Sequence, residues 1–218
     1  GQSCRPRQPA AGAAQTCVVL DDGSLYCWGS NEGGTLGAAV PPAGSAKPVH
    51  VKELGRSALE VATGGSLTCV RRVDASVACW GSVAVDAGAM PVSTPTRVPL
   101  PGNAASVTVG AAHACALLAD RRIACWGRGG RTGDGTAADR DTPALVLGTG
   151  TSDLFPVTVS AGGARTCALD RSGRVFCWGA VEPGLVDADA GGDSLAPTPA
   201  VGLPTPADAL RVGAGIVC

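Results

Sequence analysis

The chain has 218 residues with a formal net charge of −1, and 45% of them are hydrophobic, 16% charged and 3% aromatic. An apolar content this high with almost no net charge excludes a disordered chain, and the length allows one domain with a substantial core. The 17 basic residues face 18 acidic ones without a basic block, which argues against nucleic acid as the main partner because phosphate binding depends on lysine and arginine.

The first predicted element is a β-hairpin close to the N-terminus. Residues 16–28 contain an apolar run, an Asp-Asp-Gly turn signal and a second apolar run. Antiparallel pairing about this turn places Cys17 opposite Cys27, at a Cα separation that a disulfide tolerates. Because neighbouring residues on a strand point to opposite faces, the bridge and Trp28 should lie on opposite faces of the hairpin. A small sheet with apolar side chains on both faces is typical of a propeller blade.

This hairpin recurs along the chain with a period of about fifty residues, which indicates a repeat architecture. In every copy, the second cysteine of the pair is followed by Trp-Gly. We expect structural disulfides rather than zinc or redox sites, because neither of their usual cysteine spacings occurs. The expected pairs are Cys17 with Cys27, Cys69 with Cys79, Cys115 with Cys125, and Cys167 with Cys177. The tryptophans, expected to be core residues between stacked blades, are Trp28, Trp80, Trp126 and Trp178.

Each unit continues with a polar, glycine-rich loop and two further strand candidates. The first of these strands is led by a proline, at Pro48, Pro95, Pro143 and Pro199. With about four strands in a period and no helix of convincing length, we expect an all-β propeller. The prediction is one domain over 1–218, with repeats near 10–57, 58–104, 105–156 and 157–209 and a split partial repeat made from 210–218 and 1–9.

Two segments carry a family resemblance. Residues 167–179 read Cys-Ala-Leu-Asp-Arg-Ser-Gly-Arg-Val-Phe-Cys-Trp-Gly, and residues 31–37 read Asn-Glu-Gly-Gly-Thr-Leu-Gly after the first Trp-Gly. Both resemble the repeat of the regulator of chromosome condensation family, and the resemblance covers nearly the whole chain. It implies a β-propeller, usually seven-bladed, and the cysteine-paired form is similar to exported bacterial members. The chain departs from the family in having four repeats and part of a fifth, and in keeping the Asn-led loop only in the first unit.

Two cysteines remain outside the hairpin pairs. By its register Cys218 is the leading cysteine of a fifth unit, and Cys4 lies where a following strand could pair with it. We expect a disulfide between them that closes the ring and hides the two sheet edges. The alternatives are a bridge between copies, which would produce rings or fibres, and a chain that is a piece of something longer.

Motifs for catalysis and metal binding are missing from the sequence. His50 and His113 are the two histidines, and no nucleophile elbow or metalloprotease motif accompanies them. In the resembled family, a histidine at the position of His113 often has a structural role. The acidic segment 187–193 lacks the carboxylate pattern of an EF-hand, which favours a solvated loop. We therefore expect no catalytic residue, no metal and no cofactor.

The functional prediction is an exported, non-catalytic interaction or scaffold propeller, such as a subunit of an extracellular or cell-surface assembly. Ten cysteines suit a secreted, cell-surface or periplasmic protein, and no apolar run reaches the roughly 18 residues needed for membrane insertion. Hairpins that repeat and loops that vary suggest a rigid scaffold that binds a protein partner or itself. The candidate partner-binding residues, all in loops after Trp-Gly, are Asn31, Glu32, Arg128, Arg131 and Glu182.

Two other classes of function remain open. The alternative is a proteinaceous inhibitor of a secreted enzyme, an activity known for some bacterial propellers of the resembled family. It would require an aromatic-rich concave face, and the only aromatic residues beyond the tryptophans are Tyr26, Phe155 and Phe176. An enzyme such as a lyase is the less favoured possibility, because it would require converging acid and base groups.

Overall fold

The structure is a computed structural model that describes residues 5–37, 40–82, 92–180, 184–186, 193–203, 206–213 and 217. Within these residues the chain forms four antiparallel sheets of four strands each. The first two sheets contain β1 (Pro6–Ala11), β2 (Gln15–Leu20), β3 (Leu25–Gly29), β4 (Ser45–His50), and β5 (Ala58–Gly64), β6 (Leu67–Arg72), β7 (Val77–Gly81), β8 (Val92–Arg97). The other two contain β9 (Ala104–Val109), β10 (His113–Leu118), β11 (Ile123–Gly127), β12 (Arg140–Leu145), and β13 (Pro156–Gly162), β14 (Arg165–Asp170), β15 (Val175–Gly179), β16 (Ser194–Pro199).

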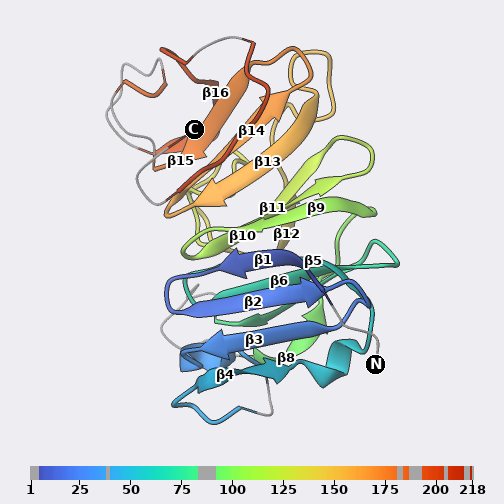
Figure 1. Ribbon diagram of the computed structural model, residues 1–218. Helices are drawn as coiled ribbons and strands as arrows, with labels where there is room; N and C mark the ends of the chain where they lie inside the picture. The colour runs from blue at the N-terminus through green and yellow to red at the C-terminus, as the bar shows by residue number, and fades with distance from the viewer. Residues whose placement is uncertain are drawn as a thin grey trace.

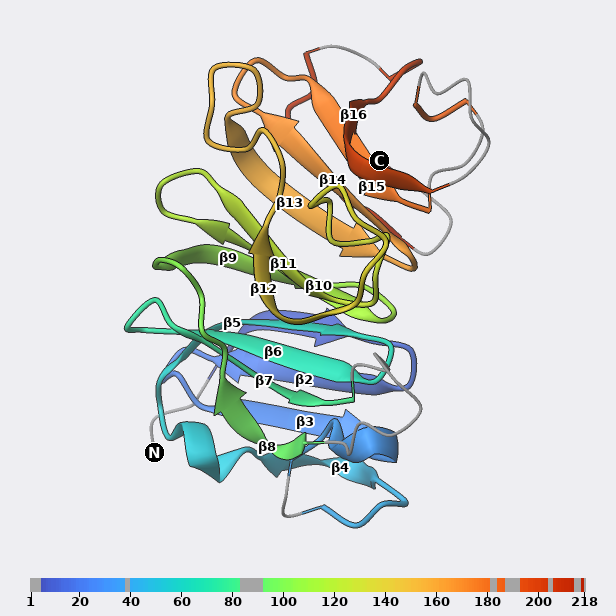
Figure 2. The same ribbon diagram turned by 180° about the vertical axis from the view of Figure 1, so that it is seen from behind.

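The four sheets stack in chain order as an open arc (Figures 1 and 2). Each sheet is a meander in which successive strands pair, and two short 3-10 turns, η1 (Glu32–Gly34) and η2 (Lys52–Leu54), lie in the connections of the first unit. The first strands pack against one another from sheet to sheet, β1 on β5, β5 on β9 and β9 on β13. This arrangement confirms the predicted all-β, propeller-like fold, although the sixteen described strands do not close into a ring.

The four predicted disulfides are all present, one in the central hairpin of each sheet. Each cysteine pair occupies directly opposed positions of its hairpin, with a Cα–Cα separation of 4.1 Å. In chain order, the bridges join Cys17 with Cys27, Cys69 with Cys79, Cys115 with Cys125, and Cys167 with Cys177. The expected pairing of these eight cysteines is therefore confirmed.

The core lies between the sheets. The Cys17–Cys27 bridge and Leu25 of the first sheet share one buried cluster with Val61 and Trp80 of the second. In the same way, Cys115 and Cys125 of the third sheet are buried in one cluster with Trp178 of the fourth. Each inner sheet therefore buries both of its faces, as the alternation of cysteine and tryptophan predicts.

The edge strands differ from the prediction in their extent. Three of the prolines expected to lead a strand, Pro48, Pro95 and Pro143, lie inside β4, β8 and β12, and Pro199 ends β16. All of these strands are at sheet edges, where a residue without an N–H removes no ladder hydrogen bond. The strands can therefore begin before their prolines.

Residues 6–9, which we expected in a split repeat with residues 210–218, complete the first sheet instead. Residues 6–9 belong to β1, which pairs with β2 through Ala10 opposite Cys17 and Ala11 opposite Thr16. Without β1, the inner edge of β2 would lack a hydrogen-bonded neighbour, which explains why these residues complete the first sheet instead.

At the other end of the chain, residues 209–213 pack on the fourth sheet, and Val212 lies where the first strand of a fifth unit would run. Val212 pairs with Val217, as Ala11 pairs with Thr16. The Val212 N–H donates to Ser160 Oγ at 3.0 Å, just as the Ala161 N–H donates to the Thr108 hydroxyl one unit earlier. Cys4 and Cys218 lie outside the described residues, so the bridge between them stays a prediction.

Candidate interaction surface

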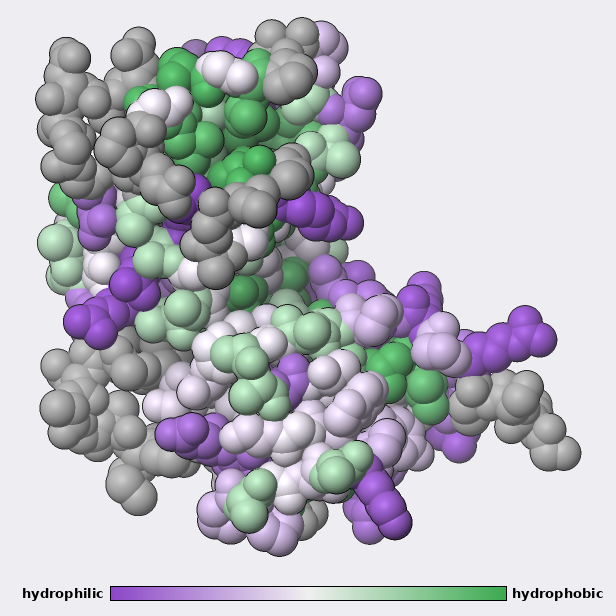
Figure 3. Space-filling model, turned by 60° about the vertical axis from the view of Figure 1, so that its left-hand side comes forward, coloured by the Kyte–Doolittle hydropathy of each residue, from purple (hydrophilic) through white to green (hydrophobic). Residues whose placement is uncertain are grey.

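The two described loops that follow Trp-Gly, after β3 and after β11, leave the stack on one side. Each begins at the end of the third strand of its sheet, and successive sheets have the same orientation. In Figure 2 the loop after β3, in blue, and the loop after β11, in yellow, both lie on the right-hand side. Viewed with this side turned forward, Figure 3 shows hydrophilic and weakly apolar residues mixed, with an apolar area at the end that carries the fourth sheet.

The first loop is organised by Asn31, one of the residues expected to contact a partner. Its side chain is 5% exposed, and its amide donates to the Val40 carbonyl at 2.8 Å while its oxygen accepts from the Leu36 N–H at 2.8 Å. Glycines with φ of 72° and 78° at positions 33 and 34 allow the tight turn that these bonds require. Asn31 therefore shapes the loop from inside, whereas its neighbour Glu32 is exposed at the surface.

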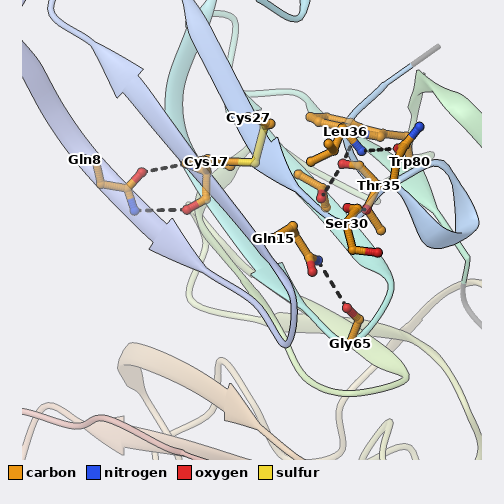
Figure 4. Close-up of a disulfide and its surroundings, with 12 residues drawn as sticks. Gln8, Gln15, Cys17, Cys27, Ser30, Thr35, Leu36, Gly65 and Trp80 are labelled. Atoms are coloured by element: carbon orange, nitrogen blue, oxygen red, sulfur yellow. Dashed lines mark hydrogen bonds between the residues drawn. A yellow bond between two sulfur atoms is a disulfide. The ribbon is translucent and has the colours of Figure 1, made fainter. Parts of the chain in front are cut away.

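The same loop joins the first sheet to the second. The Thr35 carbonyl accepts two hydrogen bonds from the second sheet, one from Trp80 Nε1 at 2.8 Å and one from Thr68 Oγ1 at 3.0 Å. Leu36 is 1% exposed and belongs to the buried cluster between the sheets. Figure 4 shows Thr35 and Leu36 beside Trp80, close to the Cys17–Cys27 disulfide. The loop is thus held rigidly by its packing.

The loop of the third unit, residues 128–139, is built around Asp134. This carboxylate accepts hydrogen bonds from Thr132, Thr136 and Arg140. Burial opposes ionisation of Asp134, but these bonds outweigh it and hold the pKa of the carboxyl below its usual range. The loop also reaches the fourth sheet, since the Gly135 N–H donates to the Leu195 carbonyl at 2.9 Å.

The charged residues at the surface of these loops have both signs. Glu32, Arg128 and Asp139 are exposed, and Arg131 is half-buried. We call the outer part of residues 30–37 and 128–139 the loop surface. Glu182, the remaining predicted contact residue, lies outside the described residues.

The four tryptophans do not share one environment. Trp80, Trp126 and Trp178 are 1%, 5% and 0% exposed, whereas Trp28 is half-buried. All four lie in the same Cys-Trp-Gly sequence, so the greater exposure of Trp28 could not be predicted from the residues beside it.

His113 is a structural residue between the third and fourth sheets. Its side chain is fully buried, and its Nε2 lies 2.7 Å from Thr166 Oγ1. Burial, assisted by the charge of Arg131, lowers the pKa of His113 to about 4. Thr166 is also fully buried, so the pair is not open to a substrate in the way that a nucleophile and its base must be.

The described part of the chain contains no cluster of three or more His, Cys, Asp or Glu side chains that could hold a metal ion. Neither of its helical turns is long and apolar enough to cross a membrane.

Two protein-family models match the repeated units of the chain. A family model described as "Regulator of chromosome condensation (RCC1) repeat" matches residues 22–71, and a second model of the same description matches residues 104–131 and 157–180. The chain therefore carries repeats of the regulator of chromosome condensation type. A search of curated protein sequences gives no significant match.

Several solved structures share the fold. Human WBSCR16 matches with a TM-score of 0.82 and 18% identity, over 98% of this chain and 57% of that one. Prp20p from Saccharomyces cerevisiae matches with a TM-score of 0.57 and 14% identity, over 94% of this chain and 67% of that one. The ectodomain of the Physcomitrella patens receptor kinase CR4 has a TM-score of 0.57 and 21% identity, with 98% and 46% covered. The chain thus spans a little over half of WBSCR16, and identities this low show the fold alone.

Proposed function

We propose that this RCC1-repeat chain is an exported interaction scaffold that binds another protein through its loop surface. The observation that supports the proposal is the combination of four disulfide-stapled sheets with the described loops after β3 and β11, which leave the stack on the same side. Disulfides of this density are typical of oxidising compartments outside the cytosol. Loops held on a rigid support are the usual place for recognition, because they lose little conformational entropy on binding.

The charge of the loop surface supports a protein partner. Glu32 and Asp139 are acidic and Arg128 and Arg131 are basic, so the described surface has no strong excess of either sign. Mixed charges complement a mixed protein surface, whereas a nucleic acid backbone requires a basic one. Arg128 is the best candidate for a contact because its side chain is exposed and arginine is enriched in protein interfaces.

One protein of the same fold, Prp20p, binds other proteins. One structure reports the binding properties of Prp20p to Gsp1p and histones, and another shows Kap60 bound to yeast Prp20. These partners belong to those proteins. What carries over to this chain is the class of function, binding of a protein by an RCC1-type propeller.

The test compares two charge-neutral double variants of the full chain in capture experiments with the secreted proteins of its source. The loop variant is Glu32→Ala with Arg128→Ala, and the matched control is Lys52→Ala with Glu53→Ala in η2, which is exposed on the opposite side of the stack. We expect a partner that the wild type and the η2 control retain and that the loop variant loses. Equal retention by both variants, or equal loss, would contradict binding through the loop surface.

A further inference from the structure

A polar groove runs along the side of the stack where the first strands of the sheets lie next to one another. Its lining comes mainly from β1, β5, β9 and β13, together with Arg211 beyond the fourth sheet. The groove has a volume of about 550 Å³, which is in the range of small-molecule sites in proteins. None of the residues that line it belongs to the loop surface.

Four of the polar side chains in the groove already have partners. The amide of Gln8 bonds to the main chain of the second sheet, where its oxygen accepts an N–H at 2.6 Å and its nitrogen donates to a carbonyl at 3.0 Å. The hydroxyls of Thr108 and Ser160 accept N–H groups of the next unit at 2.9 Å and 3.0 Å. Glu60, the acidic residue of the lining, forms an ion pair with Arg71 at 3.1 Å. The negative charge of the groove is therefore already neutralised.

The remaining polar side chains of the lining are two guanidiniums and two hydroxyls, from Arg121, Arg211, Ser106 and Thr158. Within the described part of the chain, neither guanidinium has a carboxylate partner and neither hydroxyl makes a hydrogen bond. Arg211 donates from Nη1 to the Leu210 carbonyl at 2.9 Å, which leaves its other N–H groups available. Guanidiniums and hydroxyls together favour a ligand with negatively charged oxygens.

Arg121 has a backbone conformation that favours glycine. Its φ is 70°, in the turn between β10 and β11, and the corresponding turns of the first and fourth units have glycine, each with a φ of 81°, at Gly23 and Gly173. Strain of this kind is typical of positions where a side chain has a function. The Arg121 guanidinium also lies over the ring of Phe155, 5.8 Å from its centroid, and this contact restricts the guanidinium at the edge of the groove.

Positive charge is concentrated at this end of the groove. Arg171 lies over the same Phe155 ring, at 4.9 Å, and it too has no ion pair with any residue that the structure describes. The two guanidiniums near one ring repel each other, and a bound anion would relieve this repulsion. The groove therefore offers an anion site, although the chain as a whole has a net charge of −1.

We propose that this groove binds a small molecule with two anionic groups, carboxylates or phosphates, one bound by Arg121 and the other by Arg211. Ser106 and Thr158 would complete the site as hydrogen-bond donors. Two separate cations favour a dianion over a monoanion, because each end of the ligand gains its own charge-assisted hydrogen bonds. A ligand in the groove would not contact the loop surface, so this site is independent of the proposed function.

The first test is calorimetric titration of the full chain with dianions. The probes are dicarboxylates from succinate to suberate, and fructose bisphosphate, and the controls are the monocarboxylates of matching chain length. We expect saturable binding at one site, roughly tenfold or more tighter for the best dianion than for its monoanionic control. The class of probe that binds distinguishes carboxylate from phosphate. No saturable binding of any dianion at millimolar concentration, or equal binding of the monocarboxylates, would overturn the proposal.

Arg121→Gly separates the site from the stability of the fold. Because glycine is favoured at this φ, the variant should fold, yet it should bind the dianion roughly tenfold or more weakly. Arg211→Gln should weaken binding in the same way. Two control variants should bind as the wild type does. Ala75→Gly makes a matched backbone change in the second unit, at a φ of 61°, and Lys52→Ala removes one exposed positive charge outside the groove.

Binding that is unchanged in Arg121→Gly or in Arg211→Gln would overturn the proposal. An equal loss of binding in Lys52→Ala would overturn it as well, because the net charge of the chain would then explain the binding. Capture of a protein through the loop surface should be the same for Arg121→Gly and the wild type, so the failure of one proposal is distinguishable from the failure of the other.

Discussion

Acidification should destabilise the fold through His113. The side chain is fully buried between the third and fourth sheets, and its Nδ1 has no hydrogen-bond partner among the described residues. Its pKa falls from an ordinary value of 6.5 to about 4 because burial, and secondarily the charge of Arg131, disfavours the imidazolium form. The unfolded chain therefore binds a proton at a pH where the folded chain does not.

This difference fixes both the sign and the size of the effect. The contribution of His113 is present in full above the unfolded pKa of 6.5 and is lost as the pH falls toward the folded pKa of about 4. Over this window the free energy of unfolding should fall by about 3 kcal/mol. The carboxyls with lowered pKa values, such as Asp170 at about 2, lose their contributions only at lower pH.

The assay is urea unfolding at a series of pH values, for the wild type and for His113→Gln. Glutamine keeps a side-chain N–H that can donate to the Thr166 hydroxyl, but it does not titrate. The raised pKa of Glu60, which burial causes, acts in the opposite direction and is common to both proteins. The difference between the two stabilities therefore isolates the histidine.

We expect the stability advantage of the wild type over His113→Gln to shrink steadily between about pH 6.5 and about pH 4. If this advantage is independent of pH, His113 does not titrate as its burial requires, and the reasoning is refuted. A constant offset between the two curves would report packing alone and is not the predicted signal.

Three further predictions concern stability and are checked by urea unfolding at neutral pH. Ala75 has a φ of 61°, so Ala75→Gly should stabilise the chain by about 1 kcal/mol, and a loss of stability would contradict the strain. Removing one bridge with Cys69→Ala and Cys79→Ala should cost about 3 kcal/mol, and a cost near zero would mean that the bridge does not constrain the unfolded chain. Trp80→Phe should cost about 2 kcal/mol through its lost hydrogen bond and volume, whereas Trp28→Phe should cost less than about 0.5 kcal/mol. Equal costs would show that the two tryptophans share one environment.

The hairpins could be predicted from the sequence because their geometry depends only on residues close together in the chain. The spacing of Cys17 and Cys27 about a turn, together with the alternation of side chains along a strand, determines both the bridge and the side on which Trp28 lies. The same pattern in every unit then determines the stacked, all-β architecture.

Features that depend on contacts with other strands and loops could not be predicted from the sequence. We expected residues 6–9 in a split repeat because of the register of Cys4 and Cys218, yet these residues belong to β1, an edge strand that accommodates Pro6 and Pro9. Asn31 and Glu32 are adjacent polar residues in one loop, but the carbonyls around Asn31 bury it and leave Glu32 exposed. Whether a polar side chain faces inward is decided by the backbone groups around it, which composition does not reveal.

The scaffold role rests on a stack that is stapled by disulfides outside the reducing cytosol. The most direct test is thiol alkylation of the protein from its native source under non-reducing conditions, followed by a peptide map. We expect the eight hairpin cysteines to be unalkylated and joined in the four observed pairs, in protein recovered from outside the cytoplasm. Alkylated hairpin cysteines in protein recovered from the cytoplasm would contradict an exported, disulfide-stapled scaffold.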